Sequence, residues 1–209
     1  MKYIVAFMIV ALMGAAAAQS KPWDEPWFCH GINCPSYTVV QNTSEYEVRE
    51  YPAHLWASTQ ILGIDLDKAD DTGFGRLFKY ISGANVASEK IEMTAPVRTF
   101  VSPGQGPNCG SNFTVSFYVP YAYQPPNPAP PQATSDDVFI EHSPAMRVAV
   151  ISYGGFPSQT TAVAHADTLA KALTADGVAF DAKTWFAASY DPPFRIVDRH
   201  NEVWFVVDQ

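Results

Sequence analysis

The chain has 209 residues, of which 47% are hydrophobic, with 13 Lys and Arg against 21 Asp and Glu. This composition supplies a core for one compact domain or two small ones, and it excludes a disordered or fibrous chain. The formal net charge of -8 disfavours nucleic acid and anionic membrane surfaces as partners, because both are negatively charged. A small uncharged or apolar ligand is the better expectation.

The first 18 residues have the pattern of a secretory signal peptide. Lys2 precedes an apolar run from Ile4 to Met13, and small alanines precede the expected cleavage site after Ala18. The protein is therefore predicted to be secreted and extracellular, with no membrane insertion once the signal is removed. The alternative is an uncleaved signal anchor, although the run is shorter than the ~20 apolar residues that span a bilayer.

Residues 19–36 are predicted to form an irregular arm, because prolines, tryptophans and cysteines occur there without a period. Cys29 and Cys34 enclose a short loop and are the expected disulfide, since an oxidising compartment preserves such bonds. Cys109 could instead capture one of them, because sequence does not fix the connectivity. The dipeptide Cys34-Pro35 is also a weak haem-thiolate signal, but an oxidised sulfur cannot be a thiolate ligand.

Two N-glycosylation sequons fit a secreted chain. They begin at Asn42 and Asn112. Asn42 lies in a polar turn and is the better candidate. Asn112 opens a strand-like run, where a bulky glycan has to point outward.

The segment 37–209 is predicted to be the folded domain, because regular hydrophobic patterns begin there. The spacing of apolar residues predicts a helix over 66–81, with Asp65 as N-cap and Gly83 near its end, and a second helix after Ser158 that ends at Gly177. Alternating or apolar runs predict strands at 39–40, 46–51, 55–62, 96–101, 113–119, 138–141, 146–153, 185–190 and 203–207.

A proline-rich run at 120–131 divides this domain into two halves. Each half has the order strand, strand, helix, strand, strand, which indicates an internal repeat of topology. One such half cannot bury both faces of its strands. We therefore expect the two halves to join their strands into one curved or barrel-like sheet flanked by two helices, in the α+β class.

Catalytic signatures are absent from the sequence. It has no Gly-x-Ser-x-Gly, His-Glu-x-x-His, P-loop or Cys-x-x-Cys motif, and its five histidines show no metal-ligand spacing. Asp191, Asp198 and Glu202 near His200 are interpreted as a charged rim around a strand-end loop. A hydrolase stays open as a minor alternative, although no nucleophile stands in a recognisable setting.

Two aromatic residues stand where a core does not require them. Phe194 follows a rigid Asp-Pro-Pro turn that would hold its ring outward. Phe74 lies between Gly73 and Gly75, which we interpret as space for a flat molecule to approach the first helix.

Four separated motifs resemble the SOUL haem-binding protein family. They are Tyr46–Tyr51, Lys90–Val97, Tyr190–Phe194 and Asn201–Trp204, in the order found in that family. The resemblance spans about residues 37–207. It implies a distorted antiparallel β-barrel built from two repeats and flanked by two helices. It also implies non-enzymatic binding of haem or a related tetrapyrrole.

The resemblance implies an apolar cleft between the first helix and the loop that carries the Tyr-Asp-Pro-Pro motif. The expected binding residues are Phe74, Leu77, Phe78, Tyr190, Pro192, Pro193 and Phe194. Arg76, Lys79 or Arg195 could pair with the haem propionates. The alternative is a secreted binding module for another hydrophobic small molecule or for a protein partner.

One position departs from the family pattern. Some members place a histidine, proposed as an axial haem ligand, where this chain has Glu50. A carboxylate is a poor replacement for imidazole at haem iron. His54 lies nearby in sequence and is a candidate metal ligand, although a histidine at the flank of a strand is more often solvated. We therefore expect cleft-type binding with weak or absent axial ligation.

Overall fold

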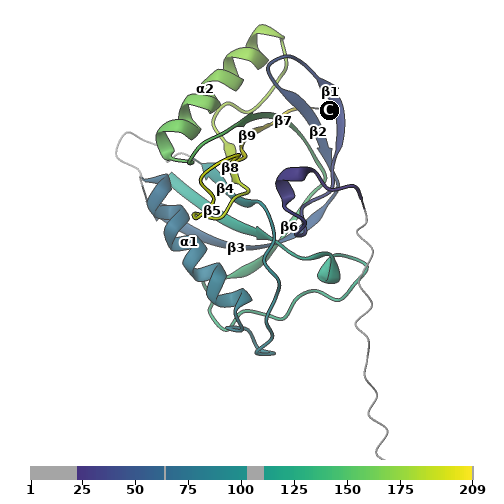
Figure 1. Cartoon of the computed structure of the whole chain (residues 1–209), viewed down its shortest axis with the longest axis vertical. Coiled ribbons are helices and arrows are strands. Elements are labelled where there is room, and N and C mark those ends of the chain that lie inside the picture. Colours follow the sequence, from purple (N-terminus) through teal and green to yellow (C-terminus); the bar gives the residue numbers. More distant parts are fainter. Residues whose placement is uncertain (1–22, 64, 103–110, 209) are drawn as a thin grey trace, which may run out of the picture.

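The computed structural model describes residues 23–63, 65–102 and 111–208. The predicted signal peptide and Cys109 lie outside these residues. The elements in chain order (Figure 1) are η1 (Trp27–Cys29), β1 (Thr38–Asn42), β2 (Glu47–Tyr51), β3 (His54–Gly63), α1 (Leu66–Ile81), β4 (Val97–Ser102), β5 (Ser111–Tyr118), η2 (Tyr121–Tyr123), β6 (Phe139–Ser143), β7 (Met146–Tyr153), α2 (Gln159–Ala175), β8 (Trp185–Ser189) and β9 (Asn201–Val206).

The described strands form one antiparallel sheet in the order β1-β2-β7-β9-β8-β4-β5-β3-β6. Apart from β1, this order is symmetric about the β4–β8 pair, so that β2 and β6, β7 and β3, and β9 and β5 occupy equivalent places. The symmetry confirms the predicted repeat. The sheet curls into a half-barrel with two helices (Figure 1), which confirms the α+β distorted-barrel expectation.

Both helices cover the same face of the curled sheet, which we call the outer face. α1 packs on β3 and β5, and α2 packs on β7 and β9. Side chains alternate along β9: Val203 and Phe205 pack in the core beneath α2, whereas Glu202 and Trp204 point to the inner face. The inner face is therefore free to receive the N-terminal arm.

The helices begin where the sequence predicts. The side chain of Asp65 accepts a hydrogen bond from Lys68 N, and Ser158 forms a capping box with Thr161. Gln159 joins the two helix starts, because its side-chain oxygen accepts from Leu66 N at 2.6 Å and its backbone N–H donates to an Asp67 carboxylate at 2.7 Å.

The two glycines around Phe74 have different surroundings. A Cβ atom added to Gly73 would lie 2.5 Å from Val115 Cβ, so α1 sits directly on β5 at this point. Gly75 has nothing within 4 Å. The interpretation that both glycines admit a flat ligand is therefore wrong for Gly73, because the sheet itself occupies that space.

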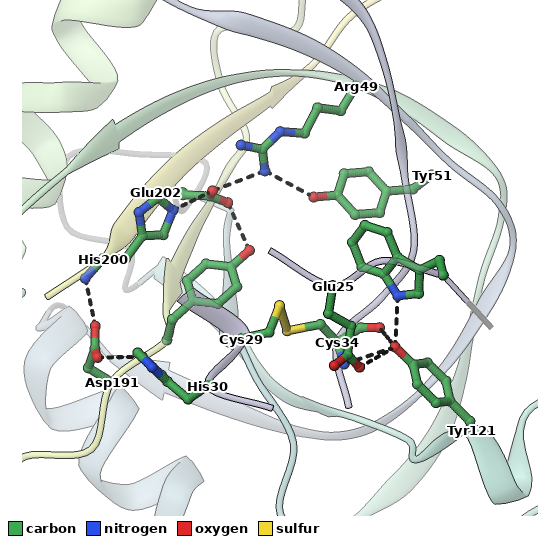
Figure 2. The surroundings of a disulfide bond; sticks show 12 residues. Glu25, Cys29, His30, Cys34, Arg49, Tyr51, Tyr121, Asp191, His200 and Glu202 are labelled. Carbon is green, nitrogen blue, oxygen red and sulfur yellow. Dashed lines mark hydrogen bonds and ion pairs between the residues drawn. A yellow bond between two sulfur atoms is a disulfide. The ribbon is translucent and has the colours of Figure 1, made fainter. Parts of the chain in front are cut away.

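The arm lies on the inner face and contains the predicted disulfide between Cys29 and Cys34, which closes a loop within the arm (Figure 2). Phe28 is buried and stacks on His200, with ring centroids 3.9 Å apart. The hydroxyl of Tyr121 donates to Cys34 O at 2.6 Å. Apolar burial and hydrogen bonds thus hold the arm against the β8–β9 loop and the η2 segment.

Candidate functional site

An open groove of about 920 Å³ lies on the outer face, between α1 and the β8–β9 loop (residues 190–200). The floor comes from the central strand pair, with Val97 and Thr99 on β4 and Ala187 and Ser189 on β8. The small side chains on β8 leave the space between the helices open.

The α1 wall of the groove is aromatic. Phe74 and Phe78 are 38% and 49% exposed, and their rings are nearly parallel, with an interplanar angle of 11° and centroids 5.7 Å apart. One helical turn separates them, so both rings lie on the same side of α1. The edge of Phe117 supports Phe74 from below. The wall therefore offers a flat apolar surface.

The opposite wall is the β8–β9 loop, in which Phe194 is 83% exposed. Polar contacts order this loop from within. Arg199 Nη1 donates to Pro192 O at 2.8 Å and to Arg195 O at 2.7 Å, and the Asp191 carboxylate accepts from His200 N at 2.6 Å. The exposed ring is thus presented by a hydrogen-bonded loop.

A carboxyl group also lines the groove. Asp70 on α1 accepts a hydrogen bond from Thr99 Oγ1 at 2.5 Å. Burial, together with the charges of Asp67 and Asp71, raises the pKa of Asp70 to about 6. No ion pair to Asp70 occurs among the described residues. Its negative charge therefore faces the groove without a cationic partner.

The third wall is the N-terminal arm, which contributes His30 and Ile32. His30 Nε2 lies 2.7 Å from Asp191 Oδ1 (Figure 2), and the His30 side chain is 24% exposed. The arm thus joins the loop at the edge of the groove.

The structure brings six of the expected binding residues to the groove. They are Phe74, Phe78, Pro192, Pro193, Phe194 and Arg195. Leu77 is fully buried in the core with Val115, and Tyr190 is buried with its hydroxyl donating to Glu202. Neither side chain lines the groove.

The other expected residues also lie outside the groove. Arg76 turns to Thr59 and Asp137, and Lys79 is exposed elsewhere on α1. His54 contacts Ser36 O at 3.3 Å, and burial lowers its pKa.

Several groove residues were missed by the sequence interpretation, although signals for them exist. Asp70 precedes Phe74 and Phe78 at four-residue intervals, so helical spacing alone places it beside them. Met93 and Thr94 stand in one of the four motifs and line the groove. His30 carries no sequence signal, because the disulfide loop and the sheet meet only in three dimensions.

Residues from three of the four family motifs, Tyr46–Tyr51, Tyr190–Phe194 and Asn201–Trp204, form a buried hydrogen-bond network on the inner face (Figure 2). The Glu202 carboxylate accepts from Arg49 Nη1 at 3.0 Å, from His200 Nε2 at 2.7 Å, from the Tyr190 hydroxyl at 2.9 Å and from Trp204 Nε1 at 2.7 Å. Burial opposes ionisation, but Arg49, His200 and Trp204 lower the pKa of Glu202 to about 2. The rim interpretation of Glu202 is therefore wrong: the side chain is fully buried.

The described residues hold no group of three His, Cys, Asp or Glu side chains that could bind a metal ion. In the same part of the chain, no helix combines the length and apolar character needed to cross a membrane. What the site offers is an open, largely apolar recess with an aromatic wall, the carboxylates of Asp70, Asp71 and Asp191, and the guanidinium groups of Arg195 and Arg199. Such a recess can bind a flat hydrophobic molecule.

Comparison with known proteins identifies the relatives of this sequence. The profile described as "SOUL heme-binding protein" matches residues 32–206. "Heme-binding protein 2" of Mus musculus is 41% identical over 179 residues, covering 84% of this chain and 86% of the relative. "Heme-binding protein 2" of Homo sapiens is 42% identical over 161 residues, covering 77% of each. The predicted resemblance is confirmed.

Solved structures support the fold. The C-terminal domain of EcmrR aligns with a TM-score of 0.58 at 12% identity, covering 83% of this chain and 98% of that domain. A structure of SAV2435 bound to tetraphenylphosphonium aligns with a TM-score of 0.50 at 9% identity, covering 78% and 94%. At these identities the likeness concerns the architecture alone.

Proposed function

Because this chain belongs to the SOUL heme-binding protein family, we propose that it binds haem or a related tetrapyrrole in the groove between α1 and the β8–β9 loop. The observation that carries the proposal is the pair of parallel, exposed rings of Phe74 and Phe78 on the wall of a groove of about 920 Å³. This volume falls in the range of about 300 to 1,000 Å³ that is typical of small-molecule sites.

The apolar contact is large enough to hold such a ligand. Covering about 300 Å² of apolar porphyrin surface at roughly 25 cal/mol per Å² gives about 7 kcal/mol before the costs of association. Phe194 adds to this contact, because its exposed ring loses water when a ligand fills the groove. A micromolar complex corresponds to about 8 kcal/mol, so the contacts of Phe194 and of the propionates must add to the porphyrin contact to reach this affinity without a bond to iron.

Polar groups at the groove suit the charged edge of a tetrapyrrole. The Arg195 guanidinium lines the groove, and its side chain is 34% exposed. Guanidinium groups pair well with carboxylates, so Arg195 would hold a propionate. The bound haem would supply an iron centre, whose redox and ligand chemistry the protein's walls would shield from water.

The proposed function is non-enzymatic. The relatives at 41% and 42% identity carry names that describe haem binding rather than a reaction. Glu50 forms an ion pair with Arg147 outside the groove, and replacing this carboxylate tests the hydrolase alternative. Glu50→Gln is expected to leave haem binding unchanged. The variant should also show the same hydrolytic activity as wild type, because none is expected in either protein.

We further propose that the protein is secreted after cleavage behind Ala18. The Cys29–Cys34 disulfide supports an oxidising compartment. Asn42 is exposed at the end of β1 and suits a glycan, whereas Asn112 is only partly exposed. Mass spectrometry of the protein released by eukaryotic cells should give an N-terminus at Gln19. Retention of the first 18 residues in the released protein would contradict this proposal.

Titration with haemin tests the binding site. The mature protein should shift and sharpen the Soret band with a micromolar dissociation constant. Phe78→Ala should weaken binding about tenfold, since roughly 1.4 kcal/mol of apolar contact is lost. The matched control is Phe139→Ala, because Phe139 is an exposed phenylalanine, 41% accessible, that does not line the groove. Equal effects of the two changes would refute the site, and an unchanged Soret band would refute haem binding.

A second candidate ligand class is an aromatic cation. The Asp70 carboxylate in the groove favours it, because no cation neutralises that charge among the described residues. A fluorescent cation such as rhodamine 6G tests the idea. Binding that is lost in Asp70→Asn, together with indifference to haemin, would favour this candidate over haem.

A further inference from the structure

We propose that His30, on the disulfide-closed arm, coordinates haem iron in the groove and exchanges its contact with Asp191 for the metal. This inference rests on the proposed function. Neutral imidazole is the commonest protein ligand for transition metals. Among the described residues, His30 is the histidine that lines the groove.

The arm fixes the position of the His30 backbone. Cys29 and Cys34 close the loop that carries it, and His30 N donates to Trp27 O at 3.1 Å. The preceding residue, Phe28, is buried and stacked on His200. The imidazole is therefore presented at the groove edge by a stapled segment (Figure 2) rather than by a free terminus.

The contact between His30 and Asp191 can be released without leaving Asp191 unpaired. The His30 side chain is 24% exposed, whereas that of Asp191 is fully buried, so the carboxylate needs other partners once His30 leaves. Asp191 keeps two other donors when His30 leaves, namely Arg195 Nε at 3.0 Å and His200 N at 2.6 Å. No buried charge is stranded, so Nε2 can turn from the carboxylate to a metal in the groove.

The other histidines are committed elsewhere. His200 donates to buried Glu202, His165 stacks on Tyr153 at 4.1 Å, and His54 contacts Ser36 O. His142 on β6 does not line the groove.

His30 lies outside the part of the chain that matches the family. The family match begins at residue 32, after His30. Glu50, which stands where some family members have a histidine, pairs with Arg147 outside the groove. The ligand proposed for this chain thus comes from a different segment.

The test is haemin titration of the mature disulfide-bonded protein, followed by absorption and electron paramagnetic resonance spectroscopy. The wild-type complex should show an imidazole-ligated iron. His30→Gly is the informative change, because His30 has φ 53°, which glycine adopts without strain. The variant should lose the imidazole signature, bind haemin at least tenfold more weakly, and regain the signature when free imidazole is added.

Three further variants separate coordination from folding. His54→Ala and His142→Ala should leave the spectrum unchanged. Replacing both Cys29 and Cys34 by serine should reproduce the spectrum of His30→Gly, because the imidazole is no longer held at the groove.

Three outcomes would overturn the proposal. His30→Gly could retain the wild-type spectrum, wild type could bind haemin without an imidazole signature, or imidazole could fail to restore the spectrum of the variant. In each of these cases haem binding itself survives. A wild-type protein that does not bind haemin would instead refute the proposed function along with this inference.

Discussion

The inner face and the outer groove of the same sheet each contain a carboxylate, but the two carboxylates differ in burial and in the number of their hydrogen-bond partners. On the inner face, Glu202 is fully buried and accepts hydrogen bonds from four side chains. In the groove, Asp70 accepts one hydrogen bond from a side chain, Thr99, beside the exposed ring of Phe74. Around Glu202 the inner face needs no ligand, although elsewhere on that face Arg98 Nε and Nη1 and Trp56 Nε1 are buried without a hydrogen-bond partner among the described residues. The groove leaves apolar surface and charge uncovered, which is the condition of a binding site.

The largest difference between the two regions should appear when an arginine is removed. Arg49→Ala leaves the Glu202 charge buried with its cationic partner gone, so the free energy of unfolding should fall by about 3 to 5 kcal/mol. Urea denaturation measures this loss. The control is Arg147→Ala, which breaks the surface pair with Glu50 and should cost about 0 to 1 kcal/mol. Comparable losses would contradict the distinction.

Two neighbouring residues of α1 should affect different properties: Leu77 the stability of the fold, and Phe78 the binding of haemin. Leu77 is fully buried, so Leu77→Ala should lower the free energy of unfolding by about 2 to 5 kcal/mol. Phe78 is half exposed in the groove, and Phe78→Ala should cost less than about 1 kcal/mol while it weakens haemin binding. Thermal unfolding and the Soret titration measure the two effects separately. A large loss of stability in Phe78→Ala would show that its ring serves the core instead.

The two carboxyl groups should give opposite pH dependences. The folded protein raises the pKa of Asp70 from 3.8 to about 6, so the stability linked to Asp70 is present at low pH and is lost as pH rises from about 4 to 6. It lowers the pKa of Glu202 from 4.5 to about 2, so that contribution is lost as pH falls from about 4.5 to 2.

Urea denaturation as a function of pH tests these signs. Titration of Asp70 should lower the free energy of unfolding by at most about 3 kcal/mol between pH 4 and 6. Asp70→Asn should remove this decrease and should leave unchanged the loss of stability at lower pH that comes from Glu202. An unchanged slope between pH 4 and 6 would show that Asp70 titrates normally.

The smallest effects should come from the glycines that flank Phe74. Gly73→Ala forces a methyl group against Val115 and should cost about 1 to 3 kcal/mol. Gly75→Ala enters open space within a helix and should stabilise the fold by up to about 1 kcal/mol. Thermal unfolding of the pair gives the sign of each change, and equal signs would contradict the packing of α1 on β5.

The secondary structure could be predicted because its signals are local. The bounds of α1 follow from the Asp65 cap, the apolar stripe and Gly83, and the predicted Ser158 cap marks the start of α2. The repeat could be predicted because the order of elements reveals it. The order of the strands in the sheet could not be predicted, because the pairs β2–β7 and β3–β6 join segments that are far apart in the sequence.

The site was predictable only in part, for a similar reason. Phe74 and Phe194 were visible because a core does not need them at those positions. Leu77 was not separable from Phe78, because adjacent positions on a helix differ in exposure only once the sheet beneath is placed. His30 and Asp70 become groove residues through tertiary contacts with Asp191 and Thr99.

A structure of the mature protein crystallised with haem tests the central claim most directly. The tetrapyrrole should lie on the outer face, against Phe74, Phe78 and Phe194, with its propionate edge toward Arg195. A haem found on the inner face or away from α1, or a groove closed by the protein's own side chains, would contradict it.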